Sequence, residues 1–194
     1  TDVYKNDRIT SSVDFMMATA LPREIEKFQI RKGDILATKD SESPDDIAVS
    51  SLVAEDLPGV LCGYHLAMIR PDARKICGSF LAWVQASKNI RAQYEAQAVG
   101  VTRYALSQSA LKDALVPIPP LSVQPRIAAY LDEQTAKIDR LMEMRRQQME
   151  LLKEQRSALI QQAVTRGLDP DAPMKDSGIP WLGEIPAHWV ITRA

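Results

Sequence analysis

The sequence has 194 residues, of which 45% are apolar and 25% charged, and this composition is typical of a globular domain that folds around its own core. Its 24 Lys and Arg residues nearly balance its 25 Asp and Glu residues, so the net charge indicates no class of partner. It has no apolar run of about 18 residues, and its start has neither a basic nor an apolar region, so we expect neither a membrane span nor export.

Residues 1–121 indicate mixed α/β structure. Short runs of β-favouring residues at 34–38, 60–62 and 65–69 are separated by turn residues, which predicts strands joined by tight turns. From Ser79, a favourable N-cap, the sequence predicts one helix through residue 94. One face of this helix collects Phe80, Trp83, Val84, Ser87, Ile90, Arg91 and Tyr94. We expect the aromatic members to pack in the core, and a shorter helix to follow Ser107.

A long helix is predicted after the prolines at positions 117, 119 and 120, which themselves exclude helix. Residues 123–165 contain no glycine, and Pro125 falls in the first turn, where its missing N–H is harmless. A helix of about 40 residues would be roughly 60 Å long, far longer than a small globule needs internally. We therefore expect it to lie against another element.

Two heptad registers run along this helix. One reads Leu131, Ile138, Arg145, Leu152, Leu159, and the other reads Ala128, Thr135, Met142, Met149, Arg156, Ala163. The polar members interrupt the apolar seam, which favours pairing with one specific helix in a fixed register. The predicted helix-pairing residues are Leu131, Ile138, Met142, Met149, Leu152 and Leu159.

The end of the chain indicates a new unit. The long helix is predicted to end at Arg166, with Gly167 in the position that follows a helix C-terminus. Residues 168–173 are rich in Pro and Asp and predict a linker. The following residues, 179–190, include Trp181 and Trp189 and are too few to fold alone.

The chain carries long runs at 118–132, 151–170 and 174–189 that together resemble type I restriction-modification DNA-specificity subunits. Residues 118–132 resemble the junction between a target-recognition domain and its spacer helix, and residues 151–170 resemble the far end of that helix. Residues 174–189 are similar to the opening of a recognition domain, whereas 32–36 and 100–107 resemble the closing half of one. The expected fold class is α/β (α+β): a target-recognition domain followed by one long coiled-coil-type α-helix.

The resemblance implies three regions and a set of partners. They are the C-terminal portion of a recognition domain (1–121), a spacer or dimerisation helix (122–166), and a linker with the start of a second recognition domain (167–194). It further implies a double-stranded DNA target read in two halves, an antiparallel helix pair as the spacer, and docking of modification (methyltransferase) and ATP-dependent restriction subunits. Residues 123–125 depart from the family in carrying a proline, and no recognition-domain opening occurs near residue 1, so we expect a fragment.

No pattern in the sequence predicts catalysis or a cofactor. There is no phosphate-binding loop, no G-x-G-x-x-G, and no Lys that has Asp or Glu two positions before it, as many nucleases require. Cys62 and Cys77 do not form a C-x-x-C pair, which predicts free thiols and a reducing, cytoplasmic location. His65 and His188 are far apart, so no metal site is expected, and His65 is expected to be a hydrogen-bonded strand residue.

Charge distribution suggests where DNA would bind. Residues 40–56 include six acids and no base, whereas 88–112 include Lys88, Arg91, Arg103 and Lys112 against Glu95 alone. The second segment would suit a phosphate backbone, although each residue could equally be part of a solvated face. The loop at 100–104 is preferred because Gly permits close approach and Arg can bind guanine through two hydrogen bonds. The candidate DNA-binding residues are Arg103, Thr102, Tyr104, Lys39, Lys88 and Arg91.

Two alternatives remain open. The chain could be a coiled-coil scaffold that binds only protein, or the specificity region of a single-chain restriction-methylase whose catalytic part lies elsewhere. Arg103 could also pair with an acid such as Glu95 or Asp113 and only brace the fold.

Overall fold

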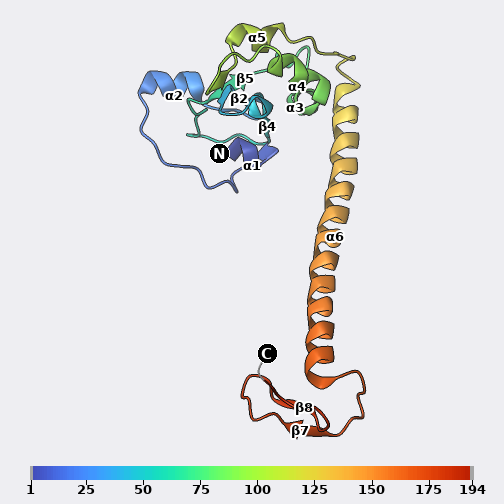
Figure 1. The fold of residues 1–194 in the computed structure, drawn as a ribbon. Helices are drawn as coiled ribbons and strands as arrows, with labels where there is room; N and C mark the ends of the chain where they lie inside the picture. Colours follow the sequence, from blue (N-terminus) through green and yellow to red (C-terminus); the bar gives the residue numbers. More distant parts are fainter. Residues whose placement is uncertain (1, 193–194) are drawn as a thin grey trace. The chain divides into compact units, whose positions relative to one another are not determined.

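A computed structural model describes residues 2–192 (Figure 1). The chain divides into two compact units, residues 1–133 and 134–194, and helix α6 (Gln124–Arg166) begins in the first and continues into the second. Mixed α/β structure followed by one long helix is the predicted fold class, which is thereby confirmed. None of the helices within residues 2–192 is long and apolar enough to cross a membrane.

The first unit is built on a four-stranded sheet in the order β1-β4-β2-β5. The β1–β4 pair is parallel, and β2 is antiparallel to both β4 and β5, with Ile35 opposite Leu52 on one side and Ile69 on the other. All four residues of β2 are buried because the strand has a neighbour on each edge and a core on each face. The strands are Arg8–Ile9 (β1), Ile35–Thr38 (β2), Ser50–Val53 (β4) and Leu66–Ile69 (β5).

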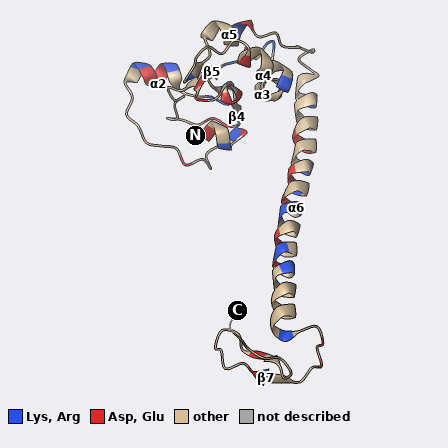
Figure 2. Ribbon diagram, in the orientation of Figure 1, with Lys and Arg blue, Asp and Glu red and all other residues tan. Residues whose placement is uncertain are grey.

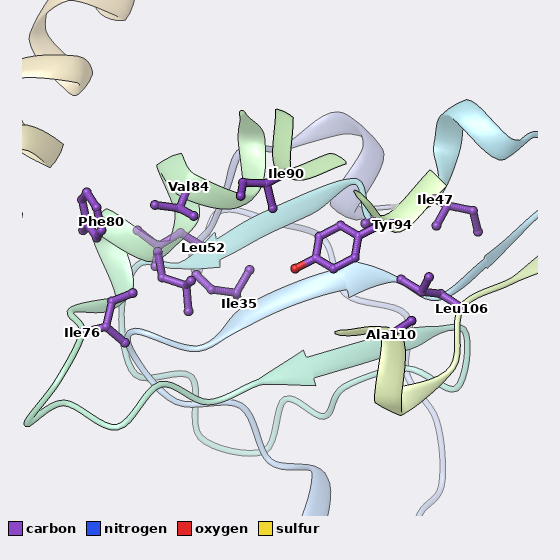
Figure 3. Packing of buried hydrophobic residues seen from close by; sticks show 12 residues of the cluster. Ile35, Ile47, Leu52, Ile76, Phe80, Val84, Ile90, Tyr94, Leu106 and Ala110 are labelled. Carbon is purple, nitrogen blue, oxygen red and sulfur yellow. The ribbon is translucent and has the colours of Figure 1, made fainter. Parts of the chain in front are cut away.

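Alternating side chains of the sheet enter two cores, as the period of two in a strand requires. Ile35 and Leu52 pack with the apolar residues of α3, α4 and α5, among them Tyr94, which is fully buried (Figure 3). Leu36 and Val53 point to the other face and join a second cluster. The covering helices on the first face are α3 (Gly78–Ala86), α4 (Lys88–Glu95) and α5 (Gln108–Asp113), and α1 (Asp2–Lys5) contributes Val3 to the second cluster.

The single helix predicted from Ser79 to residue 94 is wrong: the chain forms α3 and α4, separated at Ser87. Ser87 has extended backbone, and its hydroxyl accepts a hydrogen bond from the Ile90 N–H, so it caps α4. The N-cap of α3 is Cys77 instead of Ser79, and it makes no side-chain cap bond. The shorter helix predicted after Ser107 is confirmed as α5, with Ser107 accepting from the Ala110 N–H.

Two of the three predicted strands form, as β2 and β5, but residues 60–62 do not. This segment lies beside the end of helix α2, where Leu61 forms one isolated β-bridge with Gln29, the residue that follows the helix. Short elements that carried no clear sequence pattern complete the unit: α2 (Pro22–Phe28), β3 (Asp40–Ser41), a 3-10 turn (Pro44–Asp46) and β6 (Tyr104–Ala105).

Gly78 allows the backbone at the start of α3 to lie close to the backbone of the turn before β2. A Cβ at this position would lie 2.3 Å from the Gly33 carbonyl oxygen, a backbone atom that cannot move aside. Gly33 itself has φ +90°, a backbone conformation that other residues adopt only with strain. This glycine pair therefore seats α3 on the sheet.

The first turns of α6 are fixed to the first unit by polar contacts. Gln124 is fully buried; its amide oxygen accepts from the Cys77 N–H at 2.8 Å, and its amide nitrogen donates to the Lys75 and Pro119 carbonyls, each at 2.9 Å. Two turns on, Asp132 accepts from the Trp83 indole and pairs with Arg8. The start of the helix is therefore part of the folded domain.

The rest of α6 and a β-hairpin form the second unit. Every residue from 136 to 162 is exposed, and Gly167 ends the helix with φ +78°, as the sequence predicts. Strands β7 (Met174–Asp176) and β8 (Glu184–Pro186) pair antiparallel, and Ile185 and Pro186 are buried. A Cβ at Gly167 would lie 3.4 Å from Pro186, so the hairpin packs against the end of the helix.

Candidate nucleic-acid interface

Three segments distant in sequence meet beside the end of β2 and form what we call the polar cluster: Lys39, Asp40, Tyr64, His65 and Arg103. Strand pairing holds them together, because β3 and β6 place Asp40 opposite Ala105. Backbone hydrogen bonds extend this pairing on both sides of Lys39, whose N–H donates to the His65 carbonyl and whose carbonyl accepts from the Leu106 N–H. Backbone hydrogen bonds therefore hold the segments that carry the cluster in place.

Arg103 points at a carboxylate within this cluster. Its Nη2 donates to Asp40 Oδ1 at 2.7 Å, and His65 Nδ1 lies 2.8 Å from the same oxygen. The acid is largely covered, whereas the side chains of Arg103 and His65 are 55% and 62% exposed. Burial raises the pKa of Asp40, but the hydrogen bonds and charges of Arg103 and His65 outweigh that effect and hold the pKa below its usual value. Asp40 is therefore an anion at neutral pH.

The partner of Arg103 differs from the acids suggested by the sequence, Glu95 and Asp113. The Asp40 hydrogen bond is the main reason that the pKa of Arg103 is raised. The acidic segment 40–56 and the basic segment 88–112 are consequently mixed in space, although they are separate in sequence. Figure 2 likewise shows acidic and basic residues interspersed along α2 and α6.

Lys39 and Tyr64 lie beside this ion pair. The Lys39 ammonium sits 4.6 Å from the centre of the Tyr64 ring, a cation–π contact. Tyr64 is 83% exposed and meets His65 edge to face, with 5.2 Å between ring centres. Tyr64 is therefore a surface side chain that contacts Lys39 and His65 and is not part of either core.

The loop that carries Arg103 closes on itself. Val99 and Ala105 exchange two backbone hydrogen bonds, and Gly100 lies just inside this closure. Gly100 has φ +156°, and a Cβ there would lie 2.0 Å from the Arg103 carbonyl oxygen. The sequence suggested that this glycine allows close approach of DNA; in the structure it allows close approach of the loop's own backbone.

The other predicted DNA-binding residues differ in exposure and lie on different elements. Thr102 is exposed at the tip of the loop, whereas Tyr104 is half-buried against the first core. On α4, Arg91 is half-buried, donates to the Asp45 carbonyl and lies 4.0 Å from Glu95. Lys88 is exposed at the start of the same helix. The structure thus gathers Lys39, Thr102 and Arg103, and leaves Lys88 and Arg91 on a separate element.

Sequence reasoning missed three members of the cluster. Nothing in the sequence indicated a role for Tyr64, and Asp40 belongs to the acidic segment that was expected to disfavour DNA. His65 was expected to lie inside a strand. His65 is hydrogen-bonded as expected, but it precedes β5 and is exposed. A Tyr-His pair directly after the turn at Gly63 is the local signal that could have indicated a functional loop.

No group of three or more His, Cys, Asp or Glu residues in the described part of the chain could hold a metal ion. Cys62 and Cys77 are free thiols. Burial raises the pKa of Cys62 to about 11, which keeps the thiol protonated at neutral pH and makes it a poor nucleophile.

The apolar seam of α6 is open. Of the predicted helix-pairing residues, Ile138, Met142, Met149, Leu152 and Leu159 are between 49% and 67% exposed, whereas Leu131 is half-buried. Met144 and Leu151 are also exposed, seven residues apart and outside both registers. A series of exposed large apolar residues of this length is unusual on a surface that faces only water.

The first unit is a mixed α/β domain with a polar loop cluster, and one long helix continues from it. The chain belongs to the type I restriction modification DNA specificity domain family, whose model matches residues 3–151. Specificity subunits of this kind are the non-catalytic components of their complexes.

Individual relatives agree with this family. A type I restriction enzyme MjaX specificity subunit from Methanocaldococcus jannaschii is 28% identical over 173 residues, which are 88% of this chain and 38% of the relative. The crystal structure of the HsdS subunit from Thermoanaerobacter tengcongensis matches with TM-score 0.53 and 27% identity over 75% of this chain and 36% of that one. A structure from a study of complex assembly and conformational transition in the type I R-M system matches with TM-score 0.54 and 28% identity, covering 77% and 37%. The chain thus spans under two fifths of the length of these relatives.

Proposed function

We propose that this chain is the DNA-reading portion of a type I restriction-modification specificity subunit, which binds one half of a bipartite duplex target. The observation that carries the proposal is the family match over residues 3–151, which covers the domain that holds the polar cluster. Lys39 and Arg103 supply cations for phosphate or base contacts, and Thr102 and Tyr64 supply exposed hydroxyl groups. The free thiols fit a reducing cytoplasm.

The helix supports a second part of the proposal. The seam on α6 would pair with an equivalent helix, and the pair would hold two reading domains apart and dock modification and restriction subunits. Residues 167–194 would then be the linker and the start of a second recognition domain, after a first domain ending near residue 121. The chain by itself would perform no methylation, DNA cleavage or ATP hydrolysis, and would need no cofactor.

Salt dependence of duplex binding tests the proposal. Fluorescence anisotropy with a labelled random duplex should give measurable binding at about 50 mM salt that falls steeply by about 200 mM, because phosphate contacts release counterions. The exposed seam of α6 also favours a second candidate, a scaffold that binds only protein. The absence of duplex binding at the lower salt concentration would favour that scaffold and reject DNA reading.

A further inference from the structure

We infer that Asp40 is a positioning residue that aims the Arg103 guanidinium at a guanine edge in the major groove. The inference rests on the proposed function and deepens it, because it assigns the base class and separates a discriminating pair from general phosphate contacts. The juxtaposition that carries it is an exposed arginine held through one nitrogen by a largely covered carboxylate.

The first step is the unused hydrogen-bonding capacity of Arg103. Both of its hydrogen-bond contacts, to Asp40 at 2.7 Å and to His65 Nδ1 at 3.1 Å, involve Nη2. Within residues 2–192, its Nε and Nη1 groups make no hydrogen bond, and the side chain is 55% exposed. Asp40 uses one Nη2 N–H, and when the His65 Nδ1–H donates to Asp40 the second Nη2 N–H stays open. That N–H and the neighbouring Nη1 or Nε N–H form a planar fork that fits the O6 and N7 acceptors of guanine.

The second step is the rigidity of the support. Asp40 belongs to β3, and its side chain is only 15% exposed, so the carboxylate cannot turn freely toward solvent. The carbonyl of Arg103 abuts Gly100 in a loop closed by the Val99–Ala105 hydrogen bonds. Fixed backbone on both partners restricts the guanidinium, which reduces the entropy lost on binding a base.

The third step is the sign of the charge. A carboxylate beside DNA repels phosphate, so Asp40 lowers general affinity for any duplex. Because the Arg103 side chain is 55% exposed, solvent screens the ion pair and its contribution to folding is small. Lys39 and Tyr64 can contact the backbone without help from Asp40, so the contribution of the carboxylate to DNA reading would be the aim of Arg103.

Variants of Asp40 and Arg103 distinguish guanine recognition from simple charge neutralisation, because the two roles predict different changes in affinity and in sequence preference. Asp40→Asn keeps the shape and removes the charge, so affinity for a random duplex should stay equal or rise, whereas the preference for a selected target over a shuffled duplex should fall roughly tenfold. Arg103→Lys should lose the same preference while keeping general affinity, because an ammonium lacks the fork. The double variant should lose no more than either single one, since the two residues act as a unit.

The experiment is an anisotropy titration of the chain with a duplex selected from a random pool, with its shuffled counterpart, and with versions in which each guanine in turn is 7-deazaguanine. The unaltered protein should lose affinity at one guanine on removal of N7, and Asp40→Asn and Arg103→Lys should be insensitive at that position. Asp72→Asn is the matched control, because it removes a carboxylate from another exposed pair, Asp72–Arg74, at 2.9 Å.

Each failure has a separate meaning. If the unaltered protein prefers no sequence, the proposed function is wrong and the inference falls with it. If the protein discriminates and Asp40→Asn retains the full preference, or if the losses of Asp40→Asn and Arg103→Lys add, the inference alone is overturned. A lower melting temperature with unchanged discrimination would likewise overturn it, because Asp40 would then serve only the fold.

Discussion

The indole N–H of Trp83 donates to Asp132 Oδ1 at 2.9 Å and so joins helix α3 to the third turn of α6. Arg8 approaches the same oxygen at 2.6 Å, which makes Asp132 the acceptor for two donors from different elements. Trp83 is half-buried, whereas Phe80, Leu81 and Val84 on the same helix are buried in the core. The start of the long helix is therefore fixed by polar contacts as well as by the apolar core.

Removal of this acceptor should destabilise the first unit. Asp132→Ala leaves the Trp83 N–H and Arg8 without their partner, and we expect a loss of about 1 kcal/mol in the free energy of unfolding, because both sites are partly solvated. Urea denaturation followed by tryptophan fluorescence measures it. Asp139→Ala, at an exposed position of the same helix, is the control. Equal effects of the two substitutions would show that the contact is unimportant.

Gln124 should matter more than Asp132. Gln124→Ala would leave the partly buried Cys77 N–H and the carbonyls of Lys75 and Pro119 without these partners, and we expect a loss of roughly 2–3 kcal/mol. Gln124→Glu retains an acceptor but loses the two donated bonds, so it should also destabilise. The readout is the urea midpoint, with Gln161→Ala on the exposed part of α6 as control. A fully stable Gln124→Ala would mean that these bonds are replaced by water.

Gly100→Ala should reshape the Arg103 loop without unfolding the domain. The new methyl group would meet the Arg103 carbonyl, and the loop must open to relieve the contact. We expect weaker preference for the selected duplex and a melting temperature within a few degrees of the original, since the loop is exposed. Gly63→Ala is the control, because a Cβ there meets nothing within 4 Å. Identical duplex preference in both variants would argue against a specific loop shape.

The open seam on α6 should drive self-association of this chain. Met149→Lys together with Leu152→Lys places two charges in the seam and should shift the mass measured by light scattering from dimer to monomer. Gln147→Lys with Gln161→Lys adds the same charge on the opposite face and should leave the dimer intact. A strictly monomeric original protein at high concentration would refute pairing through this helix.

Cys62 should be slow to alkylate. Because burial raises the pKa of Cys62 to about 11, little thiolate is present at pH 8, and the folded Cys77→Ala variant should react with iodoacetamide far more slowly than the same variant in urea. The folded rate should rise as the pH approaches 11. Equal folded and unfolded rates at pH 8 would show that the thiol is open to solvent.

Local features allowed the sequence to predict α6 and α5 correctly. Residues 123–165 lack glycine and therefore favour the long helix α6, and Ser107 caps α5. Both effects depend on neighbouring residues alone, so they can be predicted without knowledge of the fold. The break at Ser87 was not predicted because the helical periodicity of apolar residues continues through it. In the structure Ser87 caps α4, and the apolar residues of α3 and α4 pack in the same core as Ile35 of β2. A capping residue inside a periodic stretch can have either role, and packing decides between them.

The candidate site was only half accessible to sequence reasoning. Lys39, Thr102 and Arg103 were chosen for their chemistry, but the partner of Arg103 lies 63 positions away. The β3–β6 pair that unites them is two residues long and has no detectable alternation. Asp40 was therefore read as part of an acidic stretch, and its contact with Arg103 becomes visible only in the folded chain.

Selection from a randomised duplex pool tests most directly whether this chain reads DNA sequence. Sequencing the duplexes retained by the purified protein at physiological salt should yield one short motif. If the chain pairs through α6, the motif should recur as an inverted repeat at constant spacing, because a two-fold pair presents its two domains in opposite directions. Retained duplexes with no enriched motif, from a folded protein at several salt concentrations, would contradict the account.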